Sequence, residues 1–256
     1  MTPSHRLKIQ RAEKHLEDLG AMLATTTSRK PYPVSEIFEP NGKKPGWVYR
    51  LDLSEAAPDE MFPIVLGDFL FNVRSALDQL VVGCAPANRK YKVSFPICAK
   101  DPLAVDQASG DYVNAEAASE WLSRTKGLPS DLVANLQALQ PYENARKFSK
   151  QAEDHPLTIL SALQNADKHR ESIGVVTGLK QVEWCIEGIR LGHVPVIKHD
   201  TVLETSEHQV QVEIEGAAVV GLGRGNKIRD WDLVTGRILD FVAIEVLRRV
   251  EPFLRR

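Results

Sequence analysis

Hydrophobic residues recur at helical spacing in several long stretches of the chain. The first predicted helix begins near Ser4, and its apolar positions recur every three or four residues: Ile9, Ala12, Leu16, Leu19 and Leu23. A second, longer helix is predicted to open at Pro58 and Asp59 and to end near Gly83. Two short helices are expected at about 115–125 and 130–139, with Pro141 ending the second.

The second half of the chain begins with another predicted helix and closes with a third long one. Asp154 is expected to cap the stretch DHPLTILSALQNADKHRES, whose predicted buried stripe is Ile159, Ala162, Leu163 and Ala166. The polar stretch before it, 142–154, is expected to be mobile. A final amphipathic helix is predicted from Trp231 to Phe253, with these apolar positions: Leu233, Ile238, Phe241, Val242, Ile244, Val246 and Leu247.

Strand periodicity appears in two regions. An alternating stretch near residue 50, bounded by Asn41-Gly42 and Pro45-Gly46, predicts a β-hairpin. Further strands are predicted in SIGVVTG, QVEWCIEGIRL and HQVQVEIEGAAVV. Because strands cluster and do not alternate with helices, the fold class is predicted as α+β. We expect the hairpin to join the later strands in one antiparallel sheet, and the long helix to pack on the DKHR helix.

Bulk composition restricts the class of protein. The 256 residues are 43% hydrophobic and 26% charged, which suits one folded domain with a mainly helical part (1–171) and a part with strands and the last helix (172–256). With 32 basic and 34 acidic residues, the chain lacks a global basic field for nucleic acid. Three cysteines without CxxC spacing favour a reducing cytoplasm. No signal peptide, membrane span, metal motif or cofactor motif is apparent, so we expect none of these.

The long helix carries the most informative stretch, GDFLFNVRSALDQL at 67–80. At 100° per residue its apolar side chains share one arc, and the opposite arc is polar: Asp68, Asn72, Arg74, Ser75, Asp78 and Gln79. This face contains no Lys or Glu, the usual solvent-facing residues of helices, and Phe71 stands in its middle. We therefore expect part of the face to be covered, and Arg74 to pair with Asp78 four residues later.

A second candidate stretch is NADKHR at 165–170, at the end of its helix. If the two helices face each other, Arg74, Asp78 and His169 would form an acid–base cluster, the candidate catalytic set. Residues expected to bind or orient around it are Asp68, Asn72, Ser75, Gln79, Asp167, Lys168 and Arg170. The alternative is a charged helix terminus without chemistry, since basic residues are common there.

Taken together, several stretches resemble a family of bacterial and phage proteins of unknown function. The family signature is roughly GDxxxNxRSALDxL followed by FPI, QPY and DKHR, and the resemblance spans about residues 8–171. The matching positions are Gly67, Asp68, Asn72, Arg74, Ser75, Ala76, Leu77, Asp78, Asp167, Lys168, His169 and Arg170. Many relatives carry His where this chain has Phe71 and Gln79. The family implies no activity.

The signature also has a distant analogy to HEPN domains, helical RNA-cleaving modules with an Arg-x4-His motif. Here Gln79 stands where that histidine would be, and glutamine cannot act as a general base. Three functions therefore stay open. They are a non-catalytic binding protein with a structural polar network, an HEPN-like RNA-processing enzyme, and a small-molecule pocket between helices and sheet. RNA as a partner and a homo-oligomer are also left open; a membrane is not expected.

Overall fold

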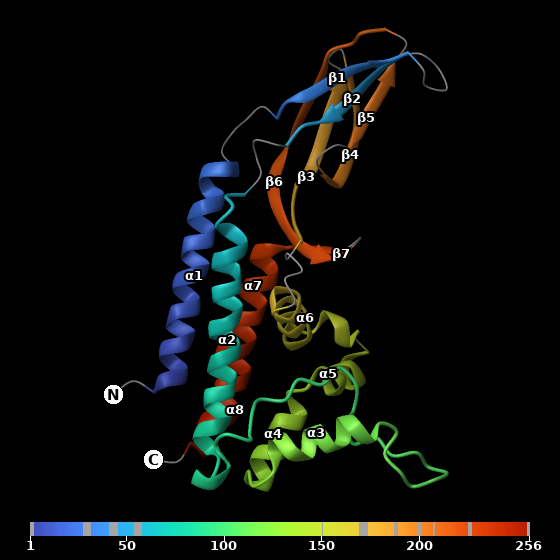
Figure 1. Cartoon of the computed structure of the whole chain (residues 1–256). Coiled ribbons are helices and arrows are strands. Elements are labelled where there is room, and N and C mark those ends of the chain that lie inside the picture. Colours follow the sequence, from blue (N-terminus) through green and yellow to red (C-terminus); the bar gives the residue numbers. More distant parts are fainter. Residues whose placement is uncertain are drawn as a thin grey trace. The chain divides into compact units, whose positions relative to one another are not determined.

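The fold combines helices and antiparallel sheets, as predicted (Figure 1). The computed structural model describes residues 3–27, 32–40, 46–53, 58–149, 151–168, 174–186, 189–198, 201–206, 208–224 and 227–254. The α-helices are α1 (Ser4–Thr27), α2 (Phe62–Cys84), α3 (Ala115–Thr125), α4 (Ser130–Ala138), α5 (Pro141–Phe148), α6 (Pro156–Lys168), α7 (Trp231–Asp240) and α8 (Leu247–Val250). Short helical turns are η2 (Ala87–Arg89), η3 (Ala152–Asp154), η4 (Phe241–Val246) and η5 (Glu251–Phe253). The strands are β1 (Val34–Glu39), β2 (Gly46–Leu51), β3 (Gly174–Ile186), β4 (Ile189–Lys198), β5 (Val202–Ser206), β6 (Val212–Arg224) and β7 (Lys227–Asp230).

The early hairpin forms as predicted and takes a later strand as its neighbour. Strands β1 and β2 pair antiparallel, and β5 adds to the other side of β2 in the order β1-β2-β5. The remaining described strands form a separate antiparallel sheet in the order β4-β3-β6-β7. The prediction that the hairpin joins a later strand in an antiparallel sheet is therefore confirmed for β5, while the other described later strands pair with one another in the second sheet.

The chain divides into two compact units, each built from segments far apart in the sequence. The first contains residues 1–16, 66–171 and 232–256, and the second contains 17–65 and 172–231. The second unit holds both sheets, and inside it the hydroxyl of buried Tyr49 accepts a hydrogen bond from the Val210 N–H at 2.7 Å. The sequence predicts a single domain, and this stays a prediction, because two compact units can belong to one domain or to two.

Helix α2 is the centre of the first unit, and its apolar arc is buried as the helical period predicts. Its fully or almost fully buried side chains are Leu66, Phe69, Leu70, Val73, Ala76, Leu77, Leu80 and Val81. The start of α1, helix α2 and the C-terminal helices lie side by side in this unit (Figure 1). None of the helices within the described ranges combines the length and apolarity needed to cross a membrane.

The C-terminal helical run spans the predicted range but changes type in its middle. It passes from α7 through the π-helical segment η4 to α8. Its buried positions are Val234, Thr235, Ile238, Val242, Val246 and Val250, whereas Leu233 and Ile244 are exposed, contrary to prediction. The wider π turn shifts the buried stripe, so one α-helical period cannot describe the whole run.

Two local predictions, at Pro141 and at Ala162, are wrong. Pro141 does not end α4 but occupies the first turn of α5, where its missing N–H costs no hydrogen bond. The described residues of the polar stretch 142–154 lie mostly in α5 and η3, and the mobility expected of this stretch stays a prediction. In α6, Ala162 is exposed, and the buried positions are Leu157, Ile159, Leu160 and Gln164.

Candidate functional site

Arg74 and Asp78 form the predicted pair on the polar face of α2. The Arg74 Nε donates to Asp78 Oδ2 at 3.2 Å, and its second terminal nitrogen lies 3.1 Å from Asp78 Oδ1. Their side chains are only partly exposed, 18% for Arg74 and 35% for Asp78. The i, i+4 spacing on one helix face places the two charges within reach of each other.

The third partner of this pair is the backbone of Phe95, in the FPI segment. Arg74 donates to the Phe95 carbonyl oxygen at 2.8 Å, and the Phe95 N–H donates to Asp78 Oδ1 at 2.9 Å. One donor and one acceptor on α2 therefore satisfy both backbone groups of one residue, as a neighbouring strand would in an antiparallel ladder. The Phe95 side chain is fully buried.

Gln140, the glutamine of the QPY segment, continues this arrangement along the next residues. It is fully buried, and its amide nitrogen donates to the carbonyl oxygens of Pro96 at 3.1 Å and Leu136 at 2.9 Å. Its amide oxygen accepts from the Cys98 N–H at 2.8 Å. Because Phe95–Cys98 belongs to no sheet, these side chains satisfy backbone groups that burial would otherwise leave unpaired.

Three pieces of the signature thus meet in one place. The side chains of Arg74, Asp78 and Gln140 hold the backbone of Phe95–Cys98, and we call this arrangement the FPI clasp. The structure joins the Arg74–Asp78 pair to the FPI segment. The partner predicted from the sequence, NADKHR, stays a prediction, and Gln140 was not among the predicted site residues. The sequence did contain a signal for the contact between Gln140 and the FPI segment, because FPI and QPY occur in the same signature.

The polar face of α2 is covered at Asn72, as predicted for part of it, but not at Phe71. Phe71 is 57% exposed, so the protein does not cover it, and the Lys8 ammonium lies 5.3 Å from its ring centre. Lys8 also donates to the buried Asn72 side chain at 3.2 Å, and Asn72 donates to the Asp68 carbonyl oxygen at 2.8 Å. The Asp68 side chain is exposed. The hydrogen bond between Lys8 and Asn72 therefore links α1 to α2.

Ser75 and Gln79 pair with each other one turn apart. The Gln79 amide nitrogen lies 3.2 Å from Ser75 Oγ, while its buried amide oxygen has no hydrogen-bond partner in the part of the chain that the structure describes. Gln79 occupies the position of the HEPN-type histidine, but its side chain supplies no titratable group. The structure therefore places no base at this position of α2.

Of the NADKHR residues, only part lies within the described structure. Helix α6 ends at Lys168; the side chains of Asp167 and Lys168, and all of His169 and Arg170, lie outside the described residues. The predicted cluster of His169 with Arg74 and Asp78 thus stays a prediction. Among the described residues, no three His, Cys, Asp or Glu side chains are grouped to hold a metal ion.

The start of α6 contacts the C-terminal helical run through a buried histidine. The His155 ring packs edge-on against Phe241 with ring centres 4.7 Å apart, and its Nδ1 accepts from the Leu157 N–H at 3.2 Å. Burial, and secondly the nearby Arg237, lower the pKa of His155 from 6.5 to about 4. His155 is therefore a neutral N-cap of α6, and the prediction that Asp154 caps this helix is wrong, because α6 begins at Pro156 and the residue directly before it is His155.

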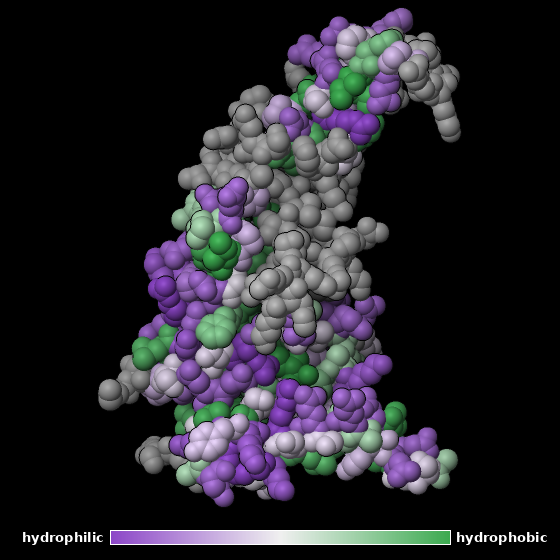
Figure 2. Space-filling view, in the orientation of Figure 1, coloured by the Kyte–Doolittle hydropathy of each residue, from purple (hydrophilic) through white to green (hydrophobic). Residues whose placement is uncertain are grey.

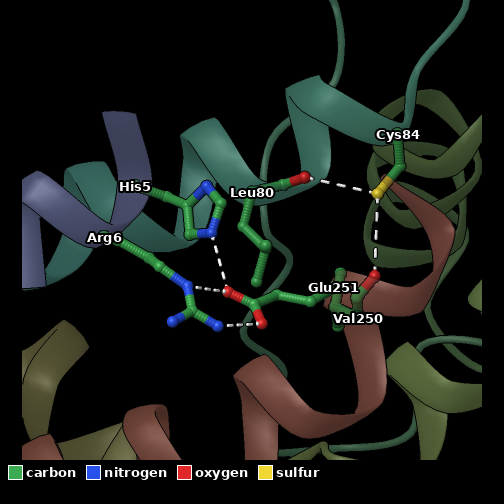
Figure 3. Close-up of polar contacts among 6 residues, drawn as sticks. All are labelled: His5, Arg6, Leu80, Cys84, Val250 and Glu251. Atoms are coloured by element: carbon green, nitrogen blue, oxygen red, sulfur yellow. Dashed lines mark hydrogen bonds and ion pairs between the residues drawn. The ribbon is translucent and has the colours of Figure 1, made fainter. Parts of the chain in front are cut away.

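A second polar cluster joins the two ends of the chain within the first unit (Figure 3). Arg6 donates to both carboxylate oxygens of Glu251, at 2.7 and 2.6 Å, and His5 Nε2 lies 3.0 Å from Glu251 Oε1. The hydrogen bond from Arg6, and less strongly the one from His5, lower the pKa of Glu251. Close by, Cys84 Sγ contacts the carbonyl oxygens of Leu80 and Val250. This cluster holds the start of α1 against the end of the C-terminal run.

Comparison of the chain with protein-family models, curated proteins and solved structures found no match.

Proposed function

We propose that this chain is a non-catalytic binding or interaction protein, in which the RSALD residues of α2 have a structural task. The observation that carries the proposal is the use of both Arg74 and Asp78 on the backbone of Phe95. A general acid or base must present its proton or lone pair to a substrate. Here the guanidinium of Arg74 and the carboxylate of Asp78, the charged donor and acceptor of this pair, both bind the backbone of Phe95.

The neighbouring residues support the same proposal. Asn72 is engaged by Lys8 and by the Asp68 carbonyl oxygen, and the Gln79 amide by Ser75. A polar network fixes one arrangement of a core to the extent that its members are satisfied, and in this network the exception among the described residues is the Gln79 amide oxygen. The resemblance to an uncharacterised bacterial and phage family belongs to the proposal and adds no activity to it. A cytoplasmic location also belongs to the proposal, and it is supported by Cys84 and Cys98, which form no disulfide within the described residues.

The proposal excludes RNA cleavage, so cleavage is the first test. The purified chain is incubated with total RNA beside Arg74→Ala, His169→Ala and, as a control on the same helix, Asp68→Ala. We expect intact RNA in all four reactions. Cleavage by the unmodified chain that is lost in Arg74→Ala or His169→Ala, but kept in Asp68→Ala, would establish an HEPN-like enzyme instead.

Binding is tested separately. The tagged chain is expressed in its native cells, purified at low salt, and any retained component is purified and titrated against the chain by calorimetry. We expect a saturable complex of defined stoichiometry. A chain that retains no component under these conditions, or only components that do not rebind when purified, contradicts the proposal.

A further inference from the structure

The segment between the FPI clasp and α3 forms a small hairpin, residues 101–113, that projects from the first unit (Figure 1). Val105 and Tyr112 pair antiparallel across it. The Asp106 N–H donates to the Asp111 carbonyl oxygen and the Val113 N–H to the Ala104 carbonyl oxygen, both at 2.9 Å. These bonds flank the pair, so Val105 and Tyr112 form a non-hydrogen-bonded pair whose side chains lie close together on one face.

The hairpin is held by its own hydrogen bonds and requires no partner to be ordered. The Asp106 carboxylate accepts from the N–H groups of Ala108 at 2.8 Å and Ser109 at 2.9 Å, and these bonds lower the pKa of Asp106. Gly110 adopts a φ of 76°, the left-handed conformation that glycine takes without strain. The turn is therefore set by its sequence, and binding through it would cost little conformational entropy.

Both ends of the hairpin are anchored to the first unit. Before it, the Cys98 N–H is held by the buried Gln140 amide of the FPI clasp. After it, Asn114 caps α3 by accepting from the Ala117 N–H at 3.0 Å. The clasp thus fixes the base from which the hairpin projects.

The exposed surface of the hairpin is apolar and acidic together. Val105, Tyr112 and Val113 are 50%, 44% and 69% exposed, although Pro102 at the base is buried. The segment 101–113 contains Asp101, Asp106 and Asp111 and no basic residue. Figure 2 shows hydrophilic and hydrophobic surface side by side on this projection. An exposed aromatic residue on a pre-ordered turn, surrounded by one sign of charge, is typical of an interaction site.

We propose that the 101–113 hairpin is a docking surface for a protein partner that presents an apolar pocket rimmed by Lys and Arg. In this complex the Val105–Tyr112 pair fills the pocket, and the three aspartates face the basic rim. The inference rests on the proposed binding function and names the surface and the chemistry of its partner.

Charge argues against the other occupants. Three carboxylates repel the phosphates of nucleic acid and the headgroups of an anionic membrane. A second copy of the chain, docked hairpin to hairpin, would bring two sets of three aspartates together, which is unfavourable. A basic protein surface is the occupant whose charge complements the hairpin.

The first test uses a photoreactive benzophenone amino acid in the full chain, placed in separate variants at Tyr112, Tyr91 and Phe71. Tyr91 is 89% exposed on another loop, and Phe71 is 57% exposed on α2, so both are accessible controls. After irradiation in native cells, we expect a discrete protein adduct from position 112 only. Mass spectrometry should map it to a partner peptide with apolar residues flanked by Lys or Arg.

Each other outcome overturns the docking site. These outcomes are no adduct at position 112, or an adduct there with nucleic acid, lipid, a second copy of the chain or an acidic peptide. An adduct at position 71 or 91 without one at 112 overturns the hairpin but leaves the proposed binding function intact, so the two failures are distinguishable.

The second test measures affinity for the crosslinked protein in purified form. Tyr112→Ser and Asp111→Lys are each expected to weaken binding about tenfold, and Asp111→Lys also to reduce its dependence on salt. The Asp111 side chain makes no hydrogen bond within the described hairpin, so its replacement leaves the turn intact. Tyr91→Ser, the matched control, should bind like the unmodified chain. Unchanged affinity for both hairpin variants overturns the proposal.

Discussion

The carboxylate of Asp78 accepts a hydrogen bond from the backbone N–H of Phe95 at 2.9 Å, while the Arg74 beside it donates to the carbonyl oxygen of the same residue. Two charged side chains on one helix turn thereby hold a loop segment seventeen residues further along the chain. The Phe95 ring is buried, so the clasp fixes the backbone from which a core side chain enters.

Replacing Asp78 tests the clasp directly. Asp78→Ala removes the acceptor for the Phe95 N–H and leaves Arg74 without its carboxylate partner. The change should lower the free energy of unfolding by about 1–3 kcal/mol. Asp78→Asn keeps an acceptor and should cost less. The measurement is denaturant unfolding followed by circular dichroism. Asp68→Ala, on the same helix but exposed, is the control and should stay within about 0.5 kcal/mol of the unmodified chain. Equal effects of Asp68→Ala and Asp78→Ala would show that the clasp does not stabilise the fold.

Gln140→Glu should be severely destabilising at neutral pH. The carboxylate cannot donate to the carbonyl oxygens of Pro96 and Leu136, and it buries an unpaired charge, at a cost of about 3–5 kcal/mol. Protonation restores a donor, so the loss should shrink as the pH falls toward 5. Gln137→Glu, three residues earlier in α4 and only partly buried, should show neither the loss nor the pH dependence. A stable Gln140→Glu chain at pH 7.5 contradicts this account.

His155 should make stability depend on pH in the weakly acidic range. Its folded pKa is about 4 and its ordinary value 6.5, so between these values the unfolded chain binds more protons. The contribution of neutral His155 to the free energy of unfolding is complete above about pH 6.5. It falls by roughly 3 kcal/mol as the pH drops toward 4, at about 1.4 kcal/mol per pKa unit. Asn is also an N-cap residue, so His155→Asn should retain the cap and flatten this part of the pH–stability profile. An unchanged slope in His155→Asn would assign the pH dependence to other groups.

Glu251→Gln should loosen the start of α1. The change removes the charge that Arg6 and His5 share, at a cost of about 1 kcal/mol because Arg6 is 54% exposed. Hydrogen exchange should accelerate in the first turns of α1, and Glu245→Gln, which breaks an exposed i, i+4 pair with Arg249, should leave those turns unaffected. The pKa of Glu251 is lower in the folded chain than its ordinary value of 4.5. The contribution of the Glu251 carboxylate to stability is therefore present above pH 4.5 and is lost as the pH falls below that value. Unaltered exchange at α1 in Glu251→Gln would contradict the link between the chain ends.

Cys98 should resist alkylation although it is not fully buried. Burial is the main cause that raises its pKa from 9.0 to about 11, with Glu120 and Asp101 adding to it and Arg124 opposing. The thiol therefore stays protonated at pH 8, and the thiolate is the reactive form. Iodoacetamide labelling, read by mass spectrometry, should be slow at pH 8 and fast only after denaturation. Rapid labelling of the folded chain at pH 8 would show that Cys98 is more accessible than the structure places it.

The sequence alone determined the elements whose side chains repeat with a regular period. The buried arc of α2, the early hairpin, the later strands and the Arg74–Asp78 pair follow from local spacing, because neighbours on one helix or strand face are set by backbone geometry. In the C-terminal run the same reasoning misplaced Ile244, which lies in the π-helical η4 where the period changes, and Leu233, which lies in the first turn of α7.

The tertiary structure alone decided which segments the polar groups hold. Phe95 lies 17 residues from Asp78, and Gln140 lies 42 residues from Cys98, so no local period relates them. The sequence showed Phe71 among polar residues, but its exposure depends on whether another segment covers it, and none of the described segments does. Periodicity reports the side of an element on which a side chain lies; its partner is decided by long-range packing that satisfies buried backbone groups.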